Sequence, residues 1–224
     1  MIDQIQQRIL EEVAGLHQVP EGAYNIRTNG QMARRNTTAN IDITSKTDVS
    51  GIDIWIKPGT VHESIHIPVV LSQSGMHDLV YNDFFVGEGS DVVIVAGCGI
   101  HNCGSQDSQH DGIHRFHVGK NAKVKYVEKH YGEGDGGGKR ILNPVTEVYM
   151  DEGSSMEMEM VQIKGVDSTD RRTKAELAEG AKLVVRERLM THGSQYAVSD
   201  YVVELNGKGA SADVVSRSVA KDES

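Results

Sequence analysis

Aromatic residues are scarce in this chain of 224 residues, at 5%, with one Trp and three Phe. Proline is also rare, with four residues, whereas glycine is abundant, with 24. Many turns and few large rings favour a core of stacked aliphatic side chains over a core built around aromatic clusters. With 38% hydrophobic and 25% charged residues, the composition is that of a globular protein with one sizeable core or two small ones.

Positive charge is in deficit, since 23 Lys and Arg stand against 32 Asp and Glu, which gives a formal net charge of −9. Nucleic-acid binding needs clustered Lys and Arg, so this balance argues against nucleic acid as a partner. It argues equally against docking on anionic lipid. No apolar run reaches the roughly 18 residues of a membrane span. The N-terminus lacks an apolar h-region, so we expect no signal peptide and no membrane partner.

Cysteine is limited to two residues, Cys98 and Cys103. Without an export signal, the expected compartment is the cytoplasm, where thiols stay reduced. We therefore expect two free thiols and no structural disulfide.

The N-terminal segment has the spacing of an amphipathic helix. Its apolar residues recur at steps of three and four, with polar residues between them. They are Ile2, Ile5, Ile9, Val13 and Leu16. The pattern predicts one helix within residues 1–20, ending near Pro20.

From about residue 40 onward, apolar and polar residues alternate as they do in β-strands. Residues 156–160 alternate strictly, with three methionines on one face and Glu157 and Glu159 on the other. We expect these outward glutamates to solvate the β surface, and not to form a catalytic pair.

A short motif recurs along this β-rich region: Gly or Asn, a small residue, a variable residue, then an apolar-x-apolar triplet. The copies begin at Gly89, Asn121, Gly153, Gly180 and Gly209, and a weaker copy begins at Gly59. Successive full copies are 32, 32, 27 and 29 residues apart. A near-constant period of this size indicates stacked units that share one core. The first two motif positions suit a tight corner with φ > 0.

Two to three strands per unit, without intervening helices, predict an all-β fold of the β-solenoid type. A β-propeller blade would need four strands in a longer repeat. A left-handed hexapeptide helix would need a strict six-residue rhythm, which is missing, so we expect a right-handed parallel β-helix. A β-sandwich whose turns happen to recur is the alternative. The expected organisation is an N-terminal helix over residues 1–20 and a β-helix core over residues 21–224.

The segment from Cys98 to His117 is rich in side chains that bind metals. Thiolate and imidazole suit zinc, iron and iron–sulfur chemistry. The candidate metal ligands are Cys98, His101, Cys103, His110 and His114. Their spacing is only loosely that of a zinc site, and purely structural roles are the alternative.

Strand alternation restricts this set of ligands. If Phe116 points inward, His114 does too, whereas His117 points outward, so the two histidines cannot hold one ion without a bulge. Cys98 has the parity of Ile94 and Ala96, so we expect it to be a buried core thiol.

The glycine-rich segment 132–139 matches the G-x-G-x-x-G pattern of phosphate-binding loops. It lacks the Ser or Thr that closes a Walker motif, and no helix signal follows it. We therefore expect a mobile surface loop there and no nucleotide site.

Six segments, which together span nearly the whole chain, match a known family. They are Glu21–Arg27, Val95–Asn102, His110–His114, Ala122–Gly132, Met158–Gly165 and Ser216–Lys221. They resemble the SufB/SufD family of the SUF iron–sulfur cluster assembly system, most strongly its shorter archaeal and bacterial forms. The resemblance implies a right-handed β-helix and a non-enzymatic scaffold that partners an ABC-type ATPase, SufC. It also implies a transient iron–sulfur cluster, and a homodimer or a SufB/SufD-type heterodimer.

In this family the ATPase docks on a C-terminal helical region beyond the β-helix, and the cysteine and histidine positions implicated in cluster assembly lie late in the core or beyond it. We expect that region to be absent here, so that the chain is a fragment, a shortened form or a form capped by a partner. None of the family's late functional residues can be carried over to this sequence.

Two other functions compete with the scaffold. One is a β-helix metalloenzyme, such as a carbonic-anhydrase-like hydratase with three histidines on one zinc, which the histidine-rich segment suggests. The other is a purely structural interaction solenoid, in which neither cysteine has a chemical role.

Overall fold

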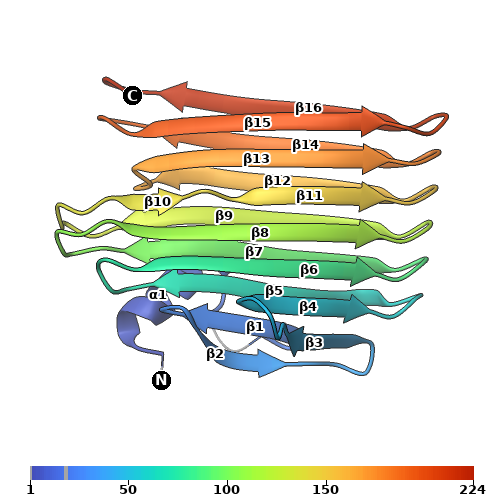
Figure 1. The fold of residues 1–224 in the computed structure, drawn as a ribbon, viewed down its shortest axis with the longest axis horizontal. Helices are drawn as coiled ribbons and strands as arrows, with labels where there is room; N and C mark the ends of the chain where they lie inside the picture. Colours follow the sequence, from blue (N-terminus) through green and yellow to red (C-terminus); the bar gives the residue numbers. More distant parts are fainter. Residues whose placement is uncertain (1, 18–19) are drawn as a thin grey trace.

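The computed structural model describes residues 2–17 and 20–224, which form one helix and 16 strands (Figure 1). The helix is α1 (Gln4–Ala14). The strands are β1 (Ala23–Thr28), β2 (Gln31–Asn36), β3 (Ile41–Ser45), β4 (Gly51–Ile56), β5 (Val61–Leu71), β6 (His77–Val86), β7 (Asp91–His101), β8 (Ser108–Val118), β9 (Lys123–Glu133), β10 (Arg140–Leu142), β11 (Val145–Met150), β12 (Ser155–Lys164), β13 (Ser168–Leu177), β14 (Lys182–Thr191), β15 (Tyr196–Leu205) and β16 (Ser211–Ala220).

The strands form two facing sheets. One has the order β16-β14-β12-β9-β7-β5-β1-β2, and the other β10-β13-β11-β8-β6-β4-β3, with β15 on β13. From β4 onward the chain alternates between the sheets, with β10 and β11 together forming one passage through the second sheet, so that each coil contributes to both. In Figure 1 the chain runs rightward along the nearer sheet and leftward along the farther one while it climbs, which makes the coil right-handed. The predicted right-handed parallel β-helix with an N-terminal helix is confirmed.

Equivalent motif positions lie directly over one another. Val92 pairs with Val124, Val124 with Met156, and Met156 with Leu183, all in parallel register. Side chains of one column therefore pack on the residue one coil earlier. Because successive coils pair in parallel through both sheets from β5 upward, the β-sandwich alternative is excluded.

The recurring motif forms the corner between the two sheets. Its first residue has φ between 56° and 73° in every copy, including the weaker copy at Gly59. Its N–H donates to the corner of the next coil, for example from Gly89 to the carbonyl of Lys120 at 2.9 Å. The following small residue is buried, as Ala122 and Ala181 are. The opposite connections vary more, with six residues at 134–139 and three at 165–167, which explains most of the drop in period from 32 to 27.

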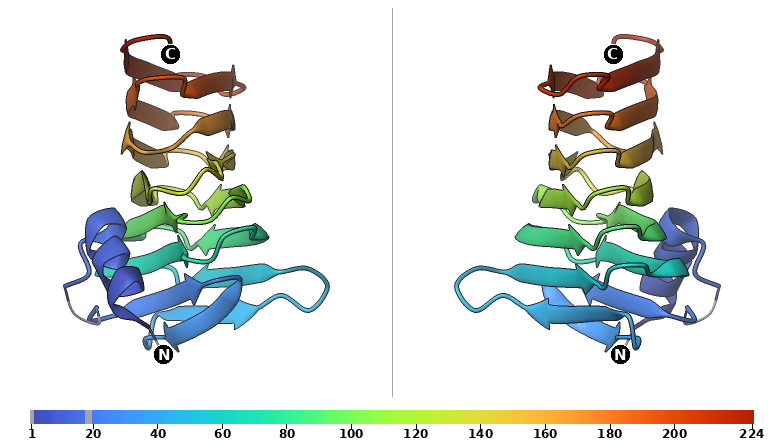
Figure 2. Two further views of the ribbon diagram at one scale, coloured as in Figure 1. Left: turned by 90° about the vertical axis from the view of Figure 1, so that its left-hand side faces the viewer. Right: turned by 90° about the vertical axis from the view of Figure 1, so that its right-hand side faces the viewer.

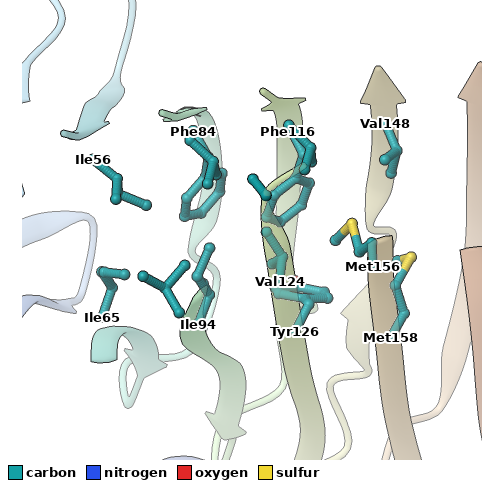
Figure 3. Close-up of a cluster of buried hydrophobic side chains, with 14 of the residues drawn as sticks. Ile56, Ile65, Phe84, Ile94, Phe116, Val124, Tyr126, Val148, Met156 and Met158 are labelled. Atoms are coloured by element: carbon teal, nitrogen blue, oxygen red, sulfur yellow. The ribbon is translucent and has the colours of Figure 1, made fainter. Parts of the chain in front are cut away.

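The largest apolar cluster of the core lies beside these corners. Figure 3 shows side chains of the two sheets facing each other, with one rung following another. Phe84 and Phe116 stack with ring centroids 4.4 Å apart and nearly parallel planes. The three inward methionines of β12 are fully covered, as the alternation predicted.

The first residues differ from the sequence prediction in two ways. The helix ends at Ala14, well before Pro20, because Gly15 adopts a left-handed conformation, with φ 64°, and closes the helix. Strand alternation is evident only from about residue 40, whereas two strands, β1 and β2, already lie before it, within the predicted core of residues 21–224. The hairpins β1–β2 and β3–β4 are antiparallel and end both sheets at this end of the solenoid (Figure 2).

Helix α1 packs on the outer face of β5, β7 and β9 (Figure 2). Two glycines of β7 make room for it, because a Cβ on Gly99 would lie 2.1 Å from Ile9 Cγ2 and a Cβ on Gly97 would lie 2.7 Å from the carbonyl oxygen of Val13. Cys98, between them, points into the core. Within the described ranges, no helix is long and apolar enough to cross a membrane.

We predict that Gly99→Ala destabilises the docked helix by about 1–3 kcal/mol, since the added methyl group overpacks a filled contact. Urea unfolding, together with proteolysis of the α1 segment, measures this loss. Gly137→Ala is the matched control: nothing lies within 4 Å of the added Cβ, so its stability should stay within about 0.5 kcal/mol of the parent. Equal stabilities of the two variants would contradict this packing.

Candidate functional site: a polar interior and an edge triad

In several coils the interior changes from apolar to polar partway along the strands. On β9, the inward-facing Val124 and Tyr126 are followed by Glu128 and His130. We call the buried polar side chains of this part the polar interior; its main members are Asp78, His110, His114, Tyr126, Glu128, His130, Gln162, Arg171 and Glu187. A side chain in this position is desolvated, so its partners decide its charge.

Arg171 carries the central positive charge of the polar interior. It extends from β13 to the facing sheet, where it donates to Glu128 of β9, and its Nε lies 3.3 Å from Glu187 Oε1 of β14. All three side chains are at most 3% exposed. Glu187 also accepts from the hydroxyls of Ser199 and Ser216, at 2.7 and 2.6 Å. The two carboxylates thus share the guanidinium of Arg171, and neutral hydroxyl donors provide the remaining hydrogen bonds to Glu187.

Glu128 stays ionised although it is buried. Burial opposes its charge, but the charge of Arg171 and the neighbouring His130 outweigh burial and hold the pKa of Glu128 well below its ordinary value. Tyr126 donates to Glu128 at 2.9 Å, so its only hydroxyl hydrogen is used there. His114 Nδ1, 2.8 Å from the same hydroxyl, must then be the donor. Burial lowers the pKa of His114 to about 4, which keeps this imidazole neutral.

A small cavity lies within the polar interior. Its volume of about 20 Å³ is room for one water molecule, and its polar lining is Cys98, His110, His114, Glu128 and His130. Burial raises the pKa of the Cys98 thiol well above its ordinary value, and the charges of Asp78 and Glu128 add to this effect. Cys98 is therefore a protonated thiol and a poor nucleophile.

His110 contacts a second buried ion pair, which Asp78 forms with Arg27. Its Nδ1 lies 3.2 Å from Asp78 Oδ2, and Arg27 donates to the other oxygen of Asp78 at 2.7 Å. Burial opposes the charge of Asp78, but the hydrogen bonds from His110 and Arg27 prevail and lower its pKa. The pair joins the polar interior to β1.

Outside the core, three side chains at the edge opposite the corners form what we call the edge triad: His101, Cys103 and Glu133. Cys103 Sγ lies 3.1 Å from His101 Nε2, and His101 Nδ1 lies 2.9 Å from Glu133 Oε1. Cys103 is exposed, whereas His101 and Glu133 are only 16% and 15% exposed. Glu133 also accepts from Arg8 of α1 and from the Tyr131 hydroxyl. The thiol is thus accessible and the imidazole is anchored.

The glycine-rich segment packs against the loop that carries Cys103. A Cβ on Gly134, Gly136 or Gly138 would lie 2.1–2.3 Å from backbone oxygens of residues 102–106. The amides of Gly136 and Gly138 donate to Asn102 and Gly104, at 3.2 and 3.0 Å. The segment therefore packs on the neighbouring loop, and its alternate glycines allow the two backbones to approach closely.

The structure divides the five predicted metal ligands into two groups. Cys98, His110 and His114 belong to the polar interior, and His101 and Cys103 to the edge triad. Across residues 2–17 and 20–224, no three or more His, Cys, Asp or Glu side chains are arranged to hold a metal ion. The inward and outward directions of His114 and His117 are as predicted, since His117 stacks outside the sheet between Phe85 and Tyr149.

Sequence reasoning missed Glu133, Glu128, His130, Arg171 and Glu187. The motif period contained a signal for two of them, because a 32-residue step leads from His101 to Glu133 and from Cys98 to His130. Arg171 and Glu187 follow the point where the repeat shortens from 32 to 27 residues, so the 32-residue step does not locate them.

A family model, "SUF system FeS cluster assembly, SufBD core domain", matches residues 100–224, which is more than half of the chain. The chain belongs to the SufBD family. This SufBD protein is therefore a component of SUF iron–sulfur cluster assembly. The matched region contains the whole edge triad and all of the polar interior except Asp78 and Cys98. No curated protein matches the chain significantly.

The neutral His114 makes the fold sensitive to acid. Between pH ~6.5 and ~4 the unfolded chain binds a proton at this residue that the folded chain excludes, so the free energy of unfolding should fall by an amount on the order of 3 kcal/mol. The lowered pKa of Glu128 acts in the same direction at lower pH. Urea unfolding across this pH range measures how steeply the free energy of unfolding depends on pH. His114→Gln should reduce that slope. An unchanged slope in the variant would show that the proton binds elsewhere.

Removing only Arg171, the cation between Glu128 and Glu187, should destabilise the fold strongly. We predict that Arg171→Met costs about 3–5 kcal/mol, because two buried carboxylates lose their counter-charge. The neutral triple variant Glu128→Gln, Arg171→Met, Glu187→Gln should recover most of that loss. Denaturant unfolding of both variants provides the comparison. A triple variant as unstable as Arg171→Met would mean that packing, and not uncompensated charge, sets the cost.

Proposed function

We propose that this SufBD protein is a non-enzymatic scaffold subunit and that Cys103 and His101 provide ligands to the iron of a cluster under assembly. The observation that carries the proposal is the pairing of an exposed thiol with an imidazole at 3.1 Å. Thiolate and imidazole are both established types of ligand for iron–sulfur clusters. Glu133 on His101 Nδ1 supports this role, because carboxylates commonly orient metal-binding histidines in this way.

Two ligands do not complete a cluster site, since iron–sulfur clusters are typically held by four protein ligands. We propose that a second scaffold subunit, identical or of the SufB/SufD type, supplies the remainder. An ABC-type ATPase of the SufC kind would be the further partner, in the cytoplasm. Membership of the SUF family supports both partners.

The remaining predicted ligands suit this role less well. Cys98 is buried and protonated, and His110 is paired with Asp78. Binding iron there would require opening the core, so their metal role stays a prediction. The hydratase alternative draws no support from the arrangement, because His114 and His117 lie on opposite faces of β8.

Anaerobic reconstitution with ferrous iron and sulfide tests the proposal. We expect visible cluster absorbance in the parent chain mixed with its second scaffold subunit, a loss to background in Cys103→Ser, and a reduction in His101→Gln. Cys98→Ala is the matched control, which removes the other thiol and should leave the absorbance unchanged. Co-purification with the ATPase tests the partner.

Loss of the cluster in Cys98→Ala but not in Cys103→Ser would transfer the site to the interior. No cluster in any sample, with no ATPase bound, would favour the purely structural solenoid.

A further inference from the structure

The outer face of the sheet that carries α1 is only half covered. Helix α1 packs on β5, β7 and β9, and in the described part of the chain no helix lies over β12, β14 or β16 (Figure 2). Three apolar side chains on these strands are solvent-exposed: Ile163 by 50%, Met190 by 36% and Val219 by 58%. Met190 and Val219 are in-register partners on adjacent coils. Exposed apolar side chains grouped in this way mark an interaction surface.

Two exposed arginines lie beside these apolar side chains. Arg188 of β14 and Arg217 of β16 are in-register partners, so two positive charges stand opposite each other on adjacent coils. Their neighbour Arg186 pairs with Asp213, whereas neither of the two has an acidic partner among the residues that the structure describes. Like charges directly opposite each other destabilise a sheet. An anionic partner would remove this repulsion. We call these two arginines and the three exposed apolar residues the open face.

Helix α1 shows how this sheet binds a helix. Its Glu12 accepts from Lys129 of β9 at 2.6 Å, and its buried residues pack on β5 and β7. Lys129 belongs to the same column as the two arginines, because Val161 pairs with Lys129 on one side and with Arg188 on the other. The surface that holds α1 is therefore continuous with the open face and presents positive charge in the same column.

We infer that the open face docks an acidic amphipathic helix of a partner protein. Its apolar side chains would cover Ile163, Met190 and Val219, and a carboxylate would lie between Arg188 and Arg217. Recognition of an amphipathic helix takes this form, with apolar anchors at steps of three and four residues. The inference does not depend on the proposed cluster, whose ligands lie at the edge of the solenoid.

Two other occupants suit the open face less well. Anionic lipid surfaces are held by clusters of about four to eight Lys and Arg, whereas two arginines are present here. A second copy in a two-fold contact would present the same patch to itself, so arginines would meet arginines. An acidic helix is the occupant whose charge complements the face.

The test uses the full chain and a fluorescent synthetic peptide with the sequence of residues 3–16, in which a hydrocarbon staple replaces the exposed side chains at 4 and 8. The staple holds a helix that would be marginal at this length. Fluorescence anisotropy measures the affinity. We expect saturable binding that weakens with salt. The double variant Arg188→Gln, Arg217→Gln should bind about fivefold more weakly, as the loss of exposed ion pairs predicts.

The matched control is the double variant Lys182→Gln, Lys208→Gln. It removes two exposed positive charges outside the open face and should leave the affinity unchanged. The peptide variant Glu12→Gln should bind the parent chain about as weakly as the original peptide binds the arginine variant. This comparison needs no change in the protein, so it decides even if the arginine variant does not fold.

Equal affinities of the original peptide for the parent and the arginine variant would overturn the inference, as would the absence of saturable binding. Self-association of the parent that is lost in the arginine variant would assign the open face to a second copy. Binding to phosphatidylserine vesicles but not to the peptide would assign it to a membrane. The arginine variant should melt no lower than the parent, because a like-charge contact is removed. A lower midpoint would show that the arginines serve the fold, against the inference.

Discussion

Parallel, in-register hydrogen bonding between successive coils is the constraint on which the other features depend. It places every side chain on the residue one coil earlier, so interacting pairs recur 32 residues apart where the period holds. His101 meets Glu133, Asp78 meets His110, and Arg115 meets Glu147 by this rule. The outer stack of Phe85 on His117 obeys it as well. The edge triad is thus a direct consequence of the register between β7 and β9.

The corners make this register possible. A residue with positive φ and a buried small residue turn the chain between the sheets in the same way in each coil, whereas connections at the opposite edge vary in length. Apolar columns lie next to the invariant corners, and the polar interior lies toward the variable edge. A buried ion network such as that of Arg171 contributes little net stability compared with apolar packing. The largest apolar cluster therefore lies beside the corners, and a smaller one, with Leu71, Ile100 and Leu142, lies near the polar interior.

The architecture could be predicted because its determinants are local. Small-residue corners, strand alternation and the inward parity of Cys98 depend on neighbouring residues or on a visible period. Helix α1 was expected to be longer because periodicity continued to Leu16, and the left-handed Gly15 ended it earlier. The packing of the glycine-rich segment could not be predicted, because its partner, the loop after β7, lies one coil away and leaves no signal in the local sequence.

The site was predictable only in part. The five candidate ligands were a list of suitable residue types, and the fold sorted them by direction into an interior group and an exposed pair. Glu133 could have been found by applying the period to His101. Arg171 could not be found in this way, because it contacts Glu128 in the facing sheet. Which residues face each other across the two sheets depends on connections whose lengths differ.

Disulfide trapping tests the register directly. In a background of Cys98→Ala and Cys103→Ser, the pair Lys125→Cys and Glu157→Cys occupies partner positions on β9 and β12. Their Cα atoms should be about 4.8 Å apart, within the roughly 4.4–6.8 Å that a disulfide spans. We expect rapid oxidation of this pair and none for Val127→Cys with Glu157→Cys, which is displaced by two residues. Preferential bridging of the displaced pair would contradict the stacking from which the core, the polar interior and the edge triad all follow.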